Sequence, residues 1–144
     1  MAETVRPVMV DSDIVIDHIR GVRQLPPLPL AYSVITRCEL FAGRDDPKRL
    51  RQLLAPMQEF PIDSEIAERG GALKRESQVP TPDALIAATA LKHRLPLMTR
   101  NRRHFERVPG LTLHTPPDQP KPTALDAPPE GPPQDSPRGD AQSA

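Results

Sequence analysis

Residues 81–91 read TPDALIAATAL, and this stretch predicts a helix that is buried on every side. Pro82 suits the first turn of a helix, where no backbone N–H is needed. No residue from 84 to 91 carries a charge, and a helix without a polar face belongs in the core of a domain. The apolar run at 96–99 that follows is a candidate strand.

Strands and helices are expected to alternate outward from this helix. Short apolar or β-branched runs predict strands at 7–10, 31–35, 60–62, 96–99 and 111–114. Amphipathic or capped segments predict further helices at 11–20, 36–43, 46–57, 63–77 and 101–108. This alternation implies a three-layer α/β/α domain with a short, mostly parallel sheet of about four or five strands.

The C-terminal part of the chain differs in composition from the rest. The last 30 residues hold nine of the 20 prolines, and Leu125 is their only large aliphatic side chain. Such a segment cannot bury enough apolar surface to offset the entropy lost on ordering. We therefore expect a folded domain at 1–116 and a disordered Pro-rich tail at 117–144.

Charge and hydropathy exclude several classes of protein. Residues 1–114 hold 17 Lys and Arg against 14 Asp and Glu, a mildly basic balance that permits a nucleic-acid partner. No apolar run approaches the roughly 20 residues of a membrane span, and the N-terminus lacks the apolar segment of a signal peptide. The single cysteine, Cys38, excludes an internal disulfide framework and a multi-cysteine zinc site. We expect a cytoplasmic protein without membrane contact.

Three acidic residues fall where predicted helices begin. Asp11 ends the first strand, Glu39 lies in the first turn after the second strand, and Asp83 opens the buried helix. Helices that connect parallel strands start at the carboxyl edge of the sheet, where ligands bind. Thr99 ends the strand at 96–99 at the same edge. The sequence therefore predicts that four separated segments meet there.

Carboxylates brought together repel, and a hard divalent cation offsets that repulsion. Mg²⁺ accepts a few carboxylates together with waters, and it can activate water and stabilise a phosphoryl transition state. Arg100, Arg102 and Arg103 follow the cluster and can hold phosphate groups. This combination suits the cleavage of a phosphodiester.

Four segments carry a more specific pattern. They read VDSDIVIDHIRG at 10–21, SVITRCELFAG at 33–43, PDALIAATA at 82–90 and LMTRNRRHF at 97–105. In this order and spacing they resemble the motifs of PIN-domain ribonucleases of the VapC toxin type, over roughly residues 8–116. The resemblance implies a PIN-like fold and a Mg²⁺-dependent endoribonuclease, with Mn²⁺ able to substitute. It also implies the toxin of a type II toxin–antitoxin pair, a cognate antitoxin, a homodimer, and structured RNA such as tRNA as substrate.

The resemblance also assigns site residues. Asp11, Glu39 and Asp83 fall on the family's acidic metal-site positions, and Thr99 falls on the hydroxyl of the last motif. Arg100, Arg102 and Arg103 are expected to contact RNA.

This chain departs from the family pattern in the last motif. Many relatives carry a further acid there, where this chain has Asn101 and His104. We include Asn101 among the catalytic candidates, because its carbonyl can ligate a metal or orient a water.

Each acidic residue also has a purely structural explanation. Both Asp11 and Asp13 can cap the first helix, and we expect Asp13 to be the cap and Asp11 to be the ligand. Glu39 has the spacing of a capping box with Thr36. Asp83 is favoured near a helix N-terminus by the helix dipole.

Two other functions fit parts of the sequence. The Asp-Ser-Asp triplet at 11–13 also opens haloacid-dehalogenase-type phosphatases, although the late segment reads Thr-Arg-Asn where such enzymes need a lysine and an acidic pair. A PIN-like module that binds RNA or protein without cutting is the other alternative, and Asn101 in place of an acid motivates it.

Overall fold

The computed structural model describes residues 5–116 of the 144-residue chain. The strands are β1 (Val8–Val10), β2 (Leu30–Ser33), β3 (Gln58–Phe60), β4 (Leu97–Met98) and β5 (Leu113–His114). The helices are α1 (Ser12–Ile19), α2 (Val34–Phe41), α3 (Pro47–Leu54), α4 (Ser64–Ser77), α5 (Thr81–His93) and α6 (Arg102–Phe105). The tail predicted at 117–144 lies outside the described residues.

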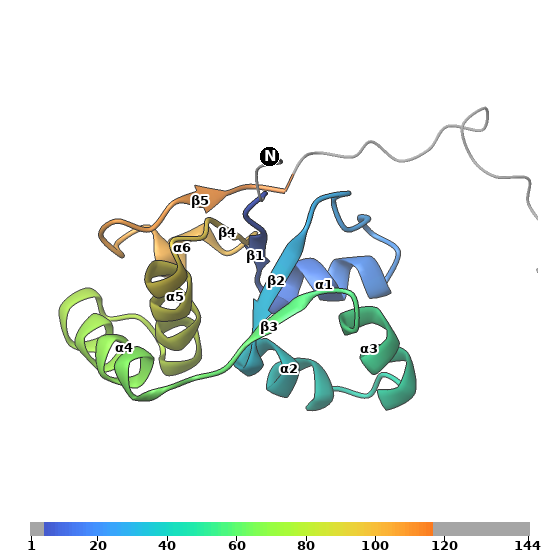
Figure 1. Ribbon diagram of the computed structural model, residues 1–144, viewed down its shortest axis with the longest axis horizontal. Coiled ribbons are helices and arrows are strands. Elements are labelled where there is room, and N and C mark those ends of the chain that lie inside the picture. The colour runs from blue at the N-terminus through green and yellow to red at the C-terminus, as the bar shows by residue number, and fades with distance from the viewer. Residues whose placement is uncertain (1–4, 117–144) are drawn as a thin grey trace, which may run out of the picture.

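The strands form one sheet in the order β3-β2-β1-β4-β5, and every pairing is parallel. Figure 1 shows α4 and α5 on one side of this sheet and α1, α2 and α3 on the other. One apolar cluster joins Met9, Ala31 and Leu97 to the α4–α5 layer. A second cluster joins the alternate strand residues Val8 and Val10 to the opposite layer. The predicted three-layer α/β/α fold is confirmed.

Helix α5 is the buried helix that the sequence predicts. Its buried residues are Ala84, Ile86, Ala87, Ala88, Thr89 and Ala90. Thr89, the polar member of this set, donates from Oγ1 to the Leu85 carbonyl 2.7 Å away, so its hydroxyl is satisfied inside the helix. Helix α5 packs chiefly against α4.

The boundary between β2 and α2 differs from the prediction. The expected strand at 31–35 ends at Ser33, whose side chain accepts from the Ile35 N–H at 3.0 Å and caps α2. Thr36 is therefore inside the helix, and the predicted capping box of Thr36 with Glu39 is wrong. Val34 and Ile35 favour strands by local preference, but the Ser33 cap and packing in the α2 layer prevail. The third strand likewise lies at Gln58–Phe60 rather than at 60–62.

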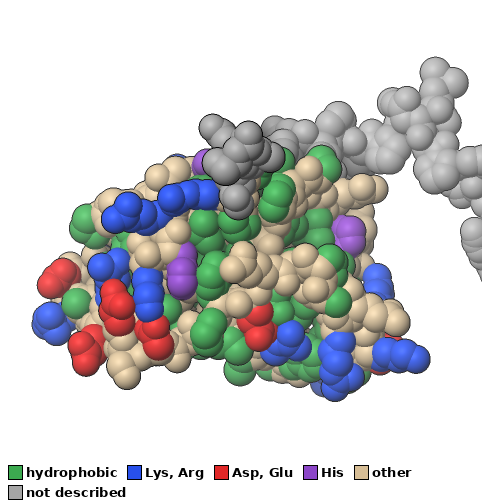
Figure 2. Space-filling model, in the orientation of Figure 1, with side chains coloured by type: hydrophobic (Ala, Val, Ile, Leu, Met, Phe, Trp, Pro, Cys, Tyr) green, Lys and Arg blue, Asp and Glu red, His purple; other side chains and the backbone are tan. Residues whose placement is uncertain are grey.

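The surface carries both signs of charge. Figure 2 shows acidic and basic side chains intermixed over α4. Lys92, in the last turn of α5, forms ion pairs with Asp63 and Glu65 at the start of α4. Within residues 5–116, no helix is long and apolar enough to cross a membrane.

Candidate active site

The ends of β1 and β4 meet at Thr99. The fully buried Thr99 hydroxyl lies 2.9 Å from Asp11 Oδ2 and 3.3 Å from Asp13 Oδ2. The same oxygen accepts from the Asn101 N–H at 3.0 Å. A hydroxyl has one proton to donate, so Thr99 serves one carboxylate at a time. The predicted proximity of Asp11 and Thr99 is observed.

Asp11, rather than Asp13, caps α1. Its Oδ1 accepts from the Ser12 N–H at 2.8 Å, so the prediction that Asp13 is the cap is wrong. Asp13 lies one residue inside the helix, and its Oδ2 accepts from the Arg100 N–H at 3.0 Å. The other oxygen of Asp13 is buried without a hydrogen-bond partner.

Asp13 is thus a site residue that the sequence analysis did not include. The available signal was the spacing of Asp11 and Asp13, which brings two carboxylates to the start of one helix. Burial raises the pKa of Asp13, and the hydrogen bond from the Arg100 backbone opposes that rise. An unpartnered carboxylate oxygen in a buried position is costly unless another group compensates it.

Asp11 is the most perturbed of these acids. Burial, followed by the charge of Asp13, raises its pKa from 3.8 to about 7, and the charge of Asp83 adds to the rise. The hydrogen bonds from Thr99 and Ser12 act in the opposite direction. Desolvation of a carboxylate that already accepts two hydrogen bonds is characteristic of functional sites.

Glu39 projects from α2 toward the same group of acids. Burial raises its pKa, the negative charges of Asp83 and Asp13 raise it further, and a hydrogen bond with the Ser12 side chain lowers it. Its Oε1 is buried without a hydrogen-bond partner. Since the capping box does not form, no helix-capping role accounts for this carboxylate.

Asp83 is in the first turn of α5, and its side chain is 15 % exposed. Its Oδ2 lies 2.5 Å from His104 Nδ1 of α6. The Asn101 side-chain nitrogen lies 2.8 Å from the same imidazole nitrogen. Asn101 and His104, the two residues at which the last motif departs from the family, therefore both lie at Asp83.

Asp11, Glu39 and Asp83, the predicted metal ligands, fit a hard divalent cation in part, and Asp13 joins them. Buried, unpartnered oxygens on Asp13 and Glu39, together with mutual repulsion between the acids, are what a cation relieves. In the described part of the chain, no set of three His, Cys, Asp or Glu side chains is arranged so that it could hold a metal ion. Mg²⁺ can be held by one or two carboxylates and several waters, so these acids can offer a site of that kind and not one with three direct side-chain ligands.

The three predicted RNA-contacting arginines are all exposed. Arg100 pairs through Nε with the buried Asp17 at 2.8 Å, and Arg102 donates to the Thr115 hydroxyl at 2.9 Å. A guanidinium carries five N–H donors, so these contacts leave further donors for phosphate. Asp13, Arg100 and Asn101 line an open hollow of about 370 Å³ beside the acids.

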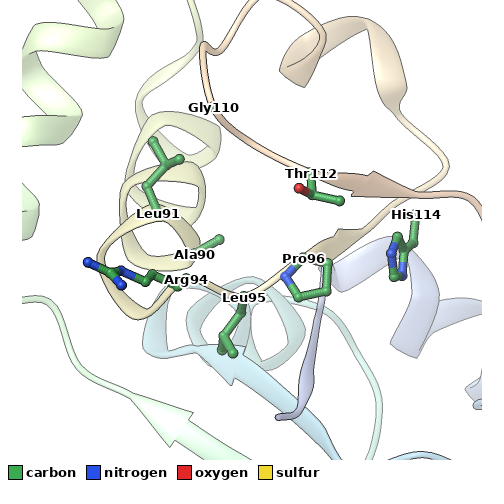
Figure 3. A pocket seen from close by; sticks show the side chains of 8 residues that line it. All are labelled: Ala90, Leu91, Arg94, Leu95, Pro96, Gly110, Thr112 and His114. Carbon is green, nitrogen blue, oxygen red and sulfur yellow. The ribbon is translucent and has the colours of Figure 1, made fainter.

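A separate hollow of about 310 Å³ lies away from these acids (Figure 3). Leu91 and Arg94 at the end of α5, Pro96 before β4 and His114 of β5 are among its lining residues. None of the predicted site residues lines it. Most of its lining precedes β4 and β5 in the chain, at the edge of the sheet opposite the one where ligands bind.

Comparison with known proteins agrees with this architecture. The family model described as PIN domain matches residues 28–111. Ribonuclease VapC10 of Mycobacterium tuberculosis is 35% identical over 113 residues, which cover 68% of this chain and 85% of that protein. Ribonuclease VapC1 of Methanocaldococcus jannaschii is 30% identical over 109 residues, covering 70% of this chain and 80% of that protein.

A solved structure also resembles this chain. A toxin–antitoxin complex from Klebsiella pneumoniae contains a chain with 34% identity and a TM-score of 0.65, covering 78% of this chain and 99% of that one. This chain belongs to the PIN domain family. Within that family it is similar to the VapC ribonucleases, as the sequence motifs predict.

Proposed function

We propose that this protein is a Mg²⁺-dependent endoribonuclease, with Mn²⁺ able to substitute, that acts as the toxin of a type II toxin–antitoxin pair. The observation that carries the proposal is the buried Asp11 carboxylate, which meets Asp13 and Thr99 where β1 and β4 end. Similarity to proteins named VapC ribonucleases supports the same activity.

The carboxylates have different proposed roles at the site. Asp11, Asp13 and Glu39 would hold the cation, directly or through water, and Asp83 would complete the acidic surface from the other side. The chemistry that a bound Mg²⁺ supplies is activation of a water and neutralisation of charge on the phosphodiester. Thr99 keeps the Asp11 carboxylate in one orientation.

The basic side chains would orient the RNA. Arg100 is held in place by Asp17, so its remaining donors are presented from a defined position. Arg102 and Arg103 add exposed positive charge on α6. Contacts of this kind bind the phosphate backbone and weaken as the salt concentration rises. We propose a structured RNA such as tRNA as the substrate, because specific recognition of RNA targets its shape and unstacked loops.

A cognate antitoxin is the proposed protein partner, and a homodimer is the proposed assembly. Similarity to a chain of a solved toxin–antitoxin complex supports the partner. A third hollow, of about 400 Å³, is lined by Val34, Arg37, Cys38 and Phe41 of α2 and by Arg51 of α3. It suits an antitoxin segment with both apolar and acidic side chains, because Phe41 offers apolar surface and the guanidinium groups of Arg37 and Arg51 lie 5.8 and 5.6 Å from the centre of its ring. Laying a helix or extended tail into such a groove is a common mode of recognition.

The test is cleavage of a labelled tRNA pool by the full chain, purified free of antitoxin, in Mg²⁺, Mn²⁺ or EDTA. Wild type should give discrete fragments only with a divalent cation. Asp11→Asn should lose at least about a hundredfold in rate, because it removes a charge at the reacting centre. The matched control is Asp45→Asn, the same change at an exposed loop position, which should cut like wild type. Cleavage by Asp11→Asn at the wild-type rate, or cleavage in EDTA, would overturn the proposal.

The second candidate is a PIN-like module that binds RNA without cutting it. The contact of His104 with Asp83 favours it, because an engaged carboxylate is less available to a cation. It predicts RNA binding by wild type with no metal-dependent fragments. The PIN-domain match leaves the phosphatase alternative without support.

A further inference from the structure

Asp17 is a buried acid on α1 that is not one of the proposed cation ligands. Its Oδ2 atom lies 2.8 Å from Arg100 Nε and 3.6 Å from Arg23 Nε. This oxygen is buried and has no hydrogen bond of regular geometry, so the two guanidinium groups compensate its negative charge. One buried carboxylate therefore draws together two arginines that would otherwise repel each other.

The chain returns to Asp17 through the turn that ends α1. Gly21 has a φ of 73°, the left-handed conformation that glycine favours after a helix. The Val22 N–H then donates to the Asp17 carbonyl at 2.9 Å. This turn brings Arg23 back beside the last turn of the helix, where its guanidinium meets the Asp17 carboxylate.

Arg100 is held at both its backbone and its side chain. The backbone N–H donates to Asp13 Oδ2 at 3.0 Å, and Nε pairs with Asp17. The side chain is nevertheless 48 % exposed, and Arg100 lines the open hollow beside the acids. Pairing through Nε leaves the N–H groups of both terminal nitrogens for a ligand. Their planar fork matches the oxygens of a phosphate group.

The charge of this group also favours an anion. Two guanidinium groups against one carboxylate leave a net charge of +1 on Arg23, Asp17 and Arg100, whereas a pair of Asp17 with Arg100 alone would be neutral. Asp17 therefore orients Arg100 without cancelling the positive charge that attracts a phosphate. A side chain that is fixed before binding also loses less conformational entropy when its ligand arrives.

We propose that Asp17 is a positioning residue that presents the Arg100 guanidinium to one phosphate group of the RNA backbone beside the acids. This role rests on the proposed function, because it presupposes RNA at the site. It goes further by assigning a phosphate subsite and the buried residue that forms it, and it requires no bound metal.

The experiment measures binding of a labelled tRNA pool to the full chain by fluorescence anisotropy in EDTA. Asp17→Asn removes a negative charge, so charge alone would tighten binding to RNA. Loss of positioning should instead weaken binding at least about threefold, because a charge-assisted hydrogen bond is lost. Asp17→Asn should cost nothing further in an Arg100→Ala background, because coupled residues are not additive. The matched control, Glu65→Gln, removes the same charge from an ion pair with Lys92 at the far end of α5 and should bind no more weakly than wild type.

Two results from these variants would overturn the role of Asp17. One is unchanged or tighter binding by a folded Asp17→Asn. The other is an equal loss from Asp17→Asn with and without Arg100, which would assign Asp17 to the fold alone. Far-UV circular dichroism and the Tm verify that each variant is folded.

A substitution at the exposed partner tests the same role without altering a buried residue. Arg100→Lys keeps the charge, but a single ammonium cannot pair with Asp17 and also offer a fork to phosphate. It should bind the tRNA pool at least about threefold more weakly than wild type, because the charge-assisted bonds of the fork are lost. Wild-type affinity in Arg100→Lys would overturn the role.

The outcomes also separate this role from the proposed nuclease. Metal-dependent cleavage by wild type, with wild-type binding in Asp17→Asn, would overturn the positioning role alone. Coupled losses of binding without any cleavage by wild type would overturn the nuclease and keep the phosphate subsite. A wild type that does not bind RNA would overturn both.

Discussion

Asp11 uses its two carboxylate oxygens for different contacts. Oδ1 caps α1 through the Ser12 N–H, and Oδ2 accepts from the Thr99 hydroxyl of the adjacent strand end. One residue therefore starts the helix and joins β1 to β4. The cap and the ligand are not competing roles, because each carboxylate oxygen has two lone pairs and can accept a hydrogen bond while it ligates a cation.

The raised pKa of Asp11 predicts how stability depends on pH in the absence of metal. In the folded state this pKa is about 7, against an ordinary value of 3.8 for an aspartate in water. Between these values the folded chain keeps a proton that the unfolded chain has released, so the free energy of unfolding falls as pH rises from about 4 to 7. Asp11→Asn keeps the cap but has no such ionisation.

The variant should therefore gain stability relative to wild type across this pH range. The difference in the free energy of unfolding, Asp11→Asn minus wild type, should be larger at pH 8 than at pH 4.5 by at least about 1 kcal/mol. That corresponds to a few degrees in Tm for a domain of this size. Thermal unfolding in EDTA at the two pH values measures it. An Asp11→Asn variant that loses stability relative to wild type on going from pH 4.5 to 8 would contradict the burial argument.

At the scale of elements, the α4–α5 pair shows how closely two helices approach. A Cβ atom at Gly70 would lie 2.9 Å from Leu85 Cδ2, whereas a Cβ atom at Gly71 would meet nothing within 4 Å. Adjacent glycines on one helix therefore face different surroundings. Gly70 permits close packing on the buried helix, and Gly71 only weakens α4 by its conformational freedom.

This difference predicts unequal gains in stability from the same substitution at the two positions. Gly71→Ala should raise the free energy of unfolding by about 0.5–1 kcal/mol, because alanine loses less backbone entropy in a helix. Gly70→Ala gains the same entropy but must push the end of the Leu85 side chain away, so it should be less stabilising. Urea unfolding of the two variants compares them directly, and a larger gain from Gly70→Ala would refute the close approach.

The boundary between β2 and α2 was mispredicted for a reason that also lies at the scale of elements. Val34 and Ile35 are β-branched, and local preference therefore extends the strand through them. The Ser33 hydroxyl instead caps a helix by accepting from the Ile35 N–H, and the helix begins at Val34. The shift leaves Glu39 well inside α2, free to face the other acids.

At the scale of the whole molecule, strand order brings the site together. Strand β1 lies between β2 and β4, and the register pairs Val10 with Met98. The residues that follow this pair, Asp11 and Thr99, consequently lie side by side although 88 positions separate them. Helices that start at this edge bring Glu39 and Asp83 to the same place.

An assembled acidic site predicts that a divalent cation stabilises the whole domain. Mg²⁺ should raise the Tm more at pH 8 than at pH 5.5, because the raised pKa values of Asp11, Asp13 and Glu39 leave more of these groups protonated at the lower pH, and a ligand must first lose its proton. Differential scanning fluorimetry with Mg²⁺ or EDTA measures the shift. Asp45→Asn should show the wild-type shift and Asp11→Asn a much smaller one; equal shifts in both variants would contradict a site at Asp11.

Local sequence was sufficient for the order of elements, the buried helix α5, and the gathering of Asp11, Glu39, Asp83 and Thr99. These features follow from hydrophobic periodicity and from the rule that parallel strands end at one edge. Other features came only from the tertiary structure. They are the recruitment of Asp13, the contact of His104 with Asp83, and the pairing of Arg100 with the buried Asp17. The physical reason is that side-chain direction at a site depends on partners brought by distant segments, and no local pattern records which partner a carboxylate will meet.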